Sequence, residues 1–297
     1  MNTESLHARN GDVRLVGSLW RPGGTPRGLV LMHPGSGPSD RDNDVLFPPI
    51  RDALLDVGVA VCSFDKRGVG ESSGSWLDAG IDAQASDLLA GLGVARAAAG
   101  NLPTGLFGHS QGGWVVLEAA RAAAADFVIT NSGPSVSPRE QEIFSTEQTL
   151  RRCGWDDGAI ATAIGSFSAV MDLLATPFAE GWPRARDLPW VADMIAAEVF
   201  IPSDERLWSF AGRMIDHDPR PALRALRVPL LAVLGAEDRV VPVRDCAEVF
   251  RATVRPDLLD LRILSGGDHR LQNGDEFIDG YLDVVTSFVV ASCATTE

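Results

Sequence analysis

The stretch TGLFGHSQGG, residues 104–113, decides how the rest of the chain is interpreted. It contains the pattern GxSxG at Gly108–Gly112, between an apolar run that ends at Phe107 and an alanine-rich segment that begins near Gly112. A strand, a sharp turn and a helix in this order hold a serine hydroxyl out from a sheet, and glycines on either side of the serine prevent collisions in the turn. Ser110 is therefore the candidate nucleophile.

The segments around this stretch alternate between short apolar runs and longer runs of helical period. This pattern is typical of a parallel sheet covered by helices, so the sequence predicts an α/β fold. The opening run alternates apolar and polar residues, as an antiparallel edge strand does. The predicted strands are Val13 to Trp20, Gly28 to Met32, Val57 to Phe64, Thr104 to Phe107, Phe127 to Thr130, Pro229 to Leu234 and Leu258 to Leu264. The strongest predicted helices are Ile81 to Ala99, Gly112 to Ala124, Val243 to Ala252 and Glu276 to Val290.

One region interrupts the alternation. Ser135 to Pro221 has no clear strand, but it has several helical stretches and turn-forming sequences at both ends. We expect residues 1–134 and 222–297 to form the core domain and residues 135–221 to be a helical cap inserted into it. The tryptophans of the insertion either anchor it by packing or contribute to recognition, and the sequence leaves both roles open. They are Trp155, Trp182, Trp190 and Trp208.

A serine nucleophile needs a base that is itself oriented by a third group. Asp238 follows the strand run that ends at Leu234, and His269 follows the run that ends at Leu264. The order serine, acid, histidine is the one found in hydrolases with this strand–turn–helix serine. Ser110, Asp238 and His269 are therefore predicted to form a catalytic triad.

Other residues compete for these roles. Glu237 is an alternative orienting acid, and Asp238 could be only a turn cap. Asp268 is interpreted as a turn residue beside His269. Three further histidines follow no strand in the required way, so we interpret them as surface or packing residues: His7, His109 and His217.

The loop HPGSGP, residues 33–38, follows the strand run that ends at Met32. In hydrolases of this type, one oxyanion donor comes from this loop and the other from the residue after the nucleophile. The backbone N–H groups of Ser36 and Gln111 are therefore the predicted oxyanion hole. Gly35 could supply the amide in place of Ser36, and an ordinary glycine turn is the remaining alternative.

The segment DKRGVGES, residues 65–72, contains a GxG but is not interpreted as a dinucleotide site, because no helix clearly begins there and the third glycine is misplaced. We expect a structural role in which Asp65 and Arg67 tie neighbouring loops beneath the site. The sequence has no HExxH motif and no clustered His and Cys ligands, so neither a metal nor a cofactor is predicted.

The composition of the chain excludes some classes of binding partner. The formal charge of −14 would repel phosphate backbones and anionic lipids, so we expect neither nucleic acid nor membrane as a partner. The N-terminus shows no secretory signal pattern, and the four cysteines are widely spaced, so a cytoplasmic protein without structural disulfides is predicted. A homodimer is left open.

The motifs HPGSGPSDRDND, FDKRGVGESSG, GHSQGG, GAEDRVVP and GGDHR occur in the order found in the α/β-hydrolase superfamily, which the chain resembles. The first two motifs are more narrowly similar to a bacterial serine esterase group related to the dienelactone hydrolase and acyl-peptidase branches. The resemblance implies an eight-stranded, mostly parallel sheet and the triad Ser110, Asp238 and His269. Asp40, Arg41 and Asp42 match the group's pattern, and they either bind substrate or brace their loop.

The predicted function is a serine carboxylesterase that acts on a small-molecule ester, including a lactone or natural-product ester, through an acyl-enzyme. The same triad would serve a thioesterase, an acyltransferase or a peptidase, because the nucleophile does not determine the leaving group. A non-catalytic binding protein that retains the fold is the third hypothesis, and three catalytic residue types in the expected order argue against it.

Overall fold

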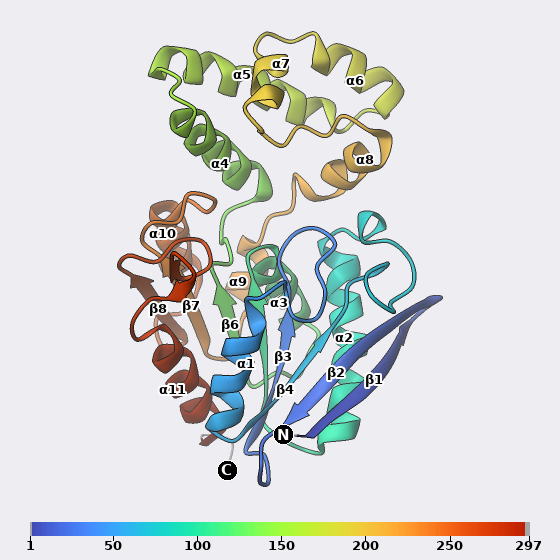
Figure 1. Ribbon diagram of the computed structural model, residues 1–297, viewed down its shortest axis with the longest axis vertical. Helices are drawn as coiled ribbons and strands as arrows, with labels where there is room; N and C mark the ends of the chain where they lie inside the picture. The colour runs from blue at the N-terminus through green and yellow to red at the C-terminus, as the bar shows by residue number, and fades with distance from the viewer. Residues whose placement is uncertain (1, 295–297) are drawn as a thin grey trace. The chain divides into compact units, whose positions relative to one another are not determined.

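The computed structural model describes residues 2–294, and eight of its strands form one sheet (Figure 1). The strands lie in the order β1-β2-β4-β3-β5-β6-β7-β8. β1 and β2 are antiparallel to their neighbours, and the pairs from β4 to β8 are parallel. The strands are β1 (Asn2–Asn10), β2 (Val13–Arg21), β3 (Gly28–His33), β4 (Val59–Phe64), β5 (Thr104–His109), β6 (Phe127–Asn131), β7 (Leu230–Gly235) and β8 (Leu259–Leu264).

The central strands are covered on both faces of the sheet. Every residue of β3, β5, β6 and β7 is buried, which explains why these strands read as continuous apolar runs without alternation. Because these strands are parallel, their C-terminal ends lie on the same side of the sheet. The loops that follow these ends carry the residues of the candidate site.

Helices cover the sheet on both faces (Figure 1). α1 (Phe47–Asp56) and α11 (Tyr281–Ala294) contact each other and share an apolar core with β3, β5 and β6. The other face carries α2 (Ile81–Ala99), α3 (Gln111–Ala120), α9 (Arg220–Ala225) and α10 (Val243–Thr253). The smaller elements are the 3₁₀ turn η1 (Trp76–Asp78) and the hairpin of β9 (Gln272–Asn273) and β10 (Glu276–Phe277).

Several predicted elements need correction. β1 was not anticipated, because only Leu6 and Ala8 of this mostly polar strand are buried. α1 was also missed; it begins Phe-Pro-Pro, and proline is favoured at the first helical positions. The predicted helix from Glu276 begins only at Tyr281, because residues 276–277 pair with β9 instead.

Residues Val136–Asp218, together with Arg239–Pro242, form a second compact unit. Its helices are α4 (Pro138–Arg152), α5 (Asp157–Leu173), α6 (Phe178–Arg186), α7 (Val191–Ala196) and α8 (Glu205–Met214). Side chains cap three of them: Ser137 and Glu140 form a capping box on α4, Asp156 caps α5 and Asp204 caps α8. The region without strands is therefore a helical insertion.

This helical unit has its own apolar core. Trp208 is 1% exposed, and its Nε1–H donates to the carbonyl of Thr176 over 2.9 Å. Trp155 and Trp182 pack against the same core, whereas Trp190 is 38% exposed. Packing within the insertion therefore accounts for the burial of Trp208.

None of the helices within residues 2–294 has the length and apolar character that a bilayer crossing requires.

Candidate active site

Ser110 occupies a strained turn between β5 and α3. Its φ is +52° and its ψ is −123°, a backbone conformation that residues with a Cβ rarely adopt. The glycines on either side make the turn sterically feasible. A Cβ on Gly108 would lie 2.1 Å from the carbonyl oxygen of Gly112, and a Cβ on Gly112 would lie 2.5 Å from that of His33. The GxSxG stretch thus folds into the strand–turn–helix predicted for it.

Two loops carry the acid and the histidine. Asp238 follows β7, His269 follows β8, and the loops cross at Gly235, where an added Cβ would lie 2.2 Å from the carbonyl oxygen of Asp268. The backbone N–H of Glu237 donates to the carbonyl of Gly267 over 2.8 Å. Because β7 and β8 are neighbouring parallel strands, these loops leave the same edge of the sheet as the turn after β5.

His269 lies within hydrogen-bond distance of both other predicted triad residues. His269 Nε2 is 2.9 Å from Ser110 Oγ, and His269 Nδ1 is 2.8 Å from Asp238 Oδ2. The aspartate accepts at Nδ1, so the neutral imidazole carries its proton there and its Nε2 can accept the serine hydroxyl proton. Asp238 is 5% exposed, whereas Glu237 is exposed to solvent. The alternative acid therefore lies on the solvent side of this turn.

His109 lies beside His269 and is not part of the hydrogen-bonded chain. Its ring is 5% exposed, and its Nδ1 is 3.1 Å from both the carbonyl oxygen and the side-chain Nδ2 of Asn131. The amide of Asn131 also accepts a 2.8 Å hydrogen bond from Tyr281 Oη. Burial, and secondly the charge of His269, lowers the pKa of His109 well below its usual value, so the ring is neutral.

The glycine loop after β3 lies against Ser110. A Cβ on Gly35 would be 3.3 Å from His109 Cδ2 and 3.5 Å from Ser110 Cβ, so the backbone of this loop lies in close contact with the turn that carries Ser110. The Gly35 N–H donates to Asn43 Oδ1 over 3.1 Å. This hydrogen bond engages the Gly35 amide and favours Ser36 as the donor from this loop. Gln111, the residue after Ser110, begins α3, where backbone N–H groups point toward the helix N-terminus.

The residues that follow the glycine loop brace it. Arg41 donates to both carboxylate oxygens of Asp65, over 2.9 Å and 2.6 Å, and its Nη1 donates to Ser18 Oγ over 2.7 Å. Asp42 pairs with Arg51 at 2.6 Å. The sequence left open whether Asp40, Arg41 and Asp42 bind substrate or brace the loop, and these contacts favour bracing for Arg41 and Asp42.

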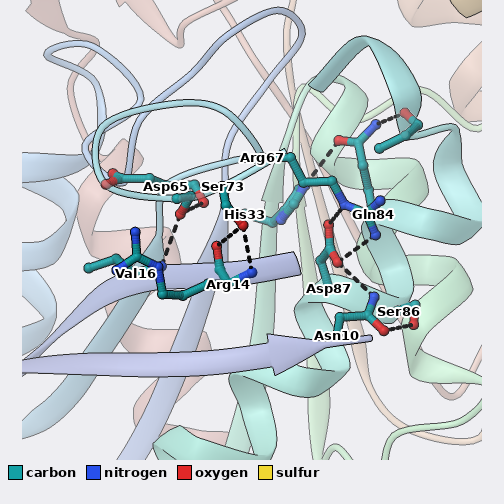
Figure 2. Close-up of polar contacts among 12 residues, drawn as sticks. Asn10, Arg14, Val16, His33, Asp65, Arg67, Ser73, Gln84, Ser86 and Asp87 are labelled. Carbon is teal, nitrogen blue, oxygen red and sulfur yellow. Dashed lines mark hydrogen bonds and ion pairs between the residues drawn. The ribbon is translucent and has the colours of Figure 1, made fainter. Parts of the chain in front are cut away.

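Arg67 ties the segment after β4 to α2 and β1 (Figure 2). Its guanidinium holds both oxygens of Asp87 at 2.6 Å and 2.8 Å, and Asn10 Nδ2 donates to the same carboxylate over 2.7 Å. Ser86 Oγ donates to Asn10 Oδ1 over 3.2 Å. The predicted structural role of Asp65 and Arg67 therefore has a physical basis in two buried or half-buried ion pairs.

Lys66, between these two residues, was not singled out by sequence reasoning. Its ammonium group is buried, donates to the Gly35 carbonyl, and lies 3.0 Å from Gln111 Oε1. It also lines a small cavity with His33 and Gln84, which has room for roughly one water molecule. Burial, and then the charge of Lys66, lowers the pKa of His33 to about 3.

Within residues 2–294, no group of three or more His, Cys, Asp and Glu side chains is arranged to hold a metal ion.

Fold and site together define an α/β-hydrolase: a mostly parallel eight-stranded sheet, a helical insertion, and a serine on the turn after β5. Residues 29–279 match the model of the alpha/beta hydrolase family, and the chain belongs to that family.

Among known proteins, the chain is 26% identical over 296 residues to a monoacylglycerol lipase of Mycolicibacterium smegmatis, with 98% of each chain covered. It is similar in structure to a thermostable carboxyl esterase of Bacillus coagulans, with a TM-score of 0.66, 18% identity and 99% of both chains covered. A proline iminopeptidase of Mycobacterium smegmatis gives a TM-score of 0.64 at 17% identity, covering 99% of this chain and 100% of the other. The two structural similarities show the shared fold alone.

Proposed function

We propose that the protein is a serine hydrolase that cleaves carboxylic esters through an acyl-enzyme intermediate. The observation that carries this proposal is the continuous chain of hydrogen bonds from Asp238 through His269 to Ser110. A structural ion pair would require only the acid and the histidine. Here a serine hydroxyl on a strained turn also lies at the second imidazole nitrogen. Nucleophilic catalysis requires this placement.

In the acylation half-reaction, His269 takes the hydroxyl proton while Ser110 Oγ forms a bond to the ester carbonyl carbon. Asp238 stabilises the resulting imidazolium. When the tetrahedral intermediate collapses, the bond to the alkoxy oxygen breaks and the imidazolium gives its proton to the departing alcohol. Water then attacks the acyl-enzyme by the same route, and the carboxylic acid leaves.

The oxyanion of each tetrahedral intermediate needs preorganised donors. The backbone N–H groups of Ser36 and Gln111 are our candidates. Support comes from the closeness of Gly35 to Ser110, from the engagement of the Gly35 amide by Asn43, and from the position of Gln111 at the start of α3.

A fluorophosphonate probe and p-nitrophenyl acetate test the nucleophile together. The folded wild-type protein is expected to be labelled at Ser110 and to hydrolyse the ester. Ser110→Ala is expected to abolish labelling and to lower turnover by several orders of magnitude, with an unchanged circular dichroism spectrum. Wild-type turnover in a folded Ser110→Ala variant would contradict the proposal, and so would a folded wild type that neither reacts with the probe nor hydrolyses esters.

The leaving group is a separate question, because the same triad can attack esters, thioesters and amides. A monoacylglycerol lipase as a relative over 98% of the chain favours oxygen esters as substrates. Comparison of kcat/KM for matched acetyl esters, acetyl thioesters and prolyl anilides tests this choice. We expect the oxygen ester to be preferred. Turnover of the anilide alone would contradict the esterase proposal and indicate a peptidase.

A further inference from the structure

We propose that Lys66 is a positioning residue that orients the two backbone donors of the oxyanion hole, Ser36 and Gln111. The inference rests on the proposed function and adds to it a residue that contacts no reacting atom. Lys66 is the only lysine in the sequence, where every other long basic side chain is an arginine. It is 7% exposed and lies in the segment after β4.

The hydrogen bond from Lys66 to Gly35 sets the direction of the Ser36 N–H. The carbonyl of Gly35 and the N–H of Ser36 belong to one planar peptide group, which is trans, so they point in opposite directions. Because Lys66 Nζ donates to that carbonyl, it fixes the peptide plane and directs the Ser36 N–H away from itself. Donation to the carbonyl also polarises the peptide and makes its N–H a stronger donor.

The preceding peptide is fixed independently. The Gly35 N–H donates to Asn43 Oδ1, so both hydrogen-bonding groups of Gly35 have partners. Rotation of this loop segment would break both contacts. Gly35 contacts the turn that carries Ser110. A glycine is conformationally free, and the hydrogen bonds to Asn43 and Lys66 restrict it.

The second contact of Lys66 reaches the other donor residue. Its Nζ is 3.0 Å from the side-chain Oε1 of Gln111, whose backbone N–H opens α3 directly after the nucleophile. The loop after β3 and the start of α3 are more than 70 positions apart in sequence. One amino group therefore joins the two segments that carry the candidate donors.

Burial of a charged amino group costs free energy of folding unless hydrogen bonds compensate for the lost hydration. Gly35 and Gln111 accept such hydrogen bonds from Lys66. Burial lowers the pKa of Lys66 to about 7. A neutral amine has two N–H donors and an ammonium has three, so both contacts persist in either form. An arginine would carry its charge on a larger planar group, which the small cavity beside His33 and Gln84 would not accommodate without displacement.

The first test compares two substitutions by methionine in the same cavity. Lys66→Met keeps most of the apolar stem but removes the donor. Gln84→Met removes a buried polar group that contacts the His33 side chain and the Ala79 carbonyl, but neither Gly35 nor Gln111. With p-nitrophenyl acetate, we expect Lys66→Met to lower kcat about 10- to 100-fold with KM changed less than about threefold. Gln84→Met is expected to keep kcat within about twofold while lowering Tm.

A transition-state analogue separates positioning from general loss of structure. Trifluoroacetophenone forms a tetrahedral adduct with a serine nucleophile, and acetophenone does not. Lys66→Met is expected to weaken inhibition by the trifluoroketone by the same factor as kcat/KM and to leave inhibition by acetophenone unchanged. Equal loss for both ketones, or no loss for either, would overturn the inference.

The wild-type protein provides a readout that does not depend on a variant folding. Because the chain has a single lysine, labelling with ¹³C-lysine gives one side-chain ε signal from the folded protein. We expect this signal to shift when trifluoroacetophenone forms its adduct and to stay in place with acetophenone. An unchanged signal in the adduct would overturn the role of Lys66. Failure of the wild type to react with the fluorophosphonate would instead contradict the proposed serine hydrolase itself.

Discussion

The imidazole rings of His109 and His269 lie 5.2 Å apart between centroids, with their planes tilted by 48°. One ring belongs to the proposed proton-transfer chain, and the other is buried beside it and hydrogen-bonded to Asn131. In the proposed mechanism His269 becomes positively charged, and a neutral neighbour does not oppose that charge. A charged neighbour at this distance would oppose that charge.

The first prediction concerns this neighbour. His109→Gln should keep a polar contact toward Asn131 and remove the ring without creating a charge. We expect kcat for p-nitrophenyl acetate to fall by less than about 10-fold, because His109 supports the position of His269 but carries no proton in the reaction. His269→Gln is the matched control and should lose several orders of magnitude. Equal losses in the two variants would give His109 a direct part in proton transfer.

The second prediction separates two adjacent carboxylates. Asp238→Asn should lower kcat about 1,000- to 10,000-fold, because an amide favours the wrong tautomer of His269 and does not stabilise the imidazolium. Glu237→Gln, one position earlier and exposed to solvent, should stay within about twofold of the wild type. Steady-state kinetics on both variants decide the assignment. A larger loss from Glu237→Gln would transfer the orienting role to that residue.

The sequence could predict those parts of the site that depend on order along the chain. Ser110 and Asp238 follow the buried strands β5 and β7, and His269 follows β8, the partly exposed last strand of the sheet. Neighbouring parallel strands bring their carboxyl ends to the same side of the sheet. The alternation of short apolar and long helical segments was sufficient for the fold class. β1 could not be predicted, because an edge strand with only two buried residues shows almost no pattern of apolar residues in the sequence.

The contacts of Lys66 and Asn43 could not be predicted in the same way. Their partners are the backbone carbonyl and the backbone N–H of Gly35. Almost every residue has these groups, so the sequence does not indicate which of them a side chain contacts. A single lysine among so many arginines was a usable signal, since it marks a position where a compact amine is preferred. The signal would have identified the residue but not its partners.

The third prediction concerns stability in acid. The pKa of His33 is lowered to about 3 by burial and by the charge of Lys66, whereas a histidine in an unfolded chain titrates near about 6.5. Between these values the unfolded chain binds a proton that the native protein excludes. The free energy of unfolding therefore decreases as the pH falls from about 6.5 toward about 3, and this contribution is fully present above that range.

His33→Gln should make this dependence shallower. Urea unfolding at several values between about pH 4 and about pH 6 should give a slope of unfolding free energy against pH that is smaller by up to roughly 1.4 kcal/mol per pH unit, the contribution of one proton. His7→Gln on β1 is the control, because that side chain is exposed and is hydrated in both states. An identical slope in the wild type and His33→Gln would show that His33 takes up no proton on unfolding.

The fourth prediction concerns the ion pair that braces the loop after β3. The carboxylate of Asp65 is 4% exposed and is held by both ends of the Arg41 guanidinium. Arg41→Met would leave that carboxylate buried without its cation, and we expect it to lower the free energy of unfolding by about 3 to 5 kcal/mol. Arg255→Met removes an equally short pair whose side chains are 59% and 61% exposed, and it should cost less than about 1 kcal/mol. Urea unfolding of the two variants at neutral pH measures the difference. Similar costs in the two variants would mean that the buried pair does not hold the loop.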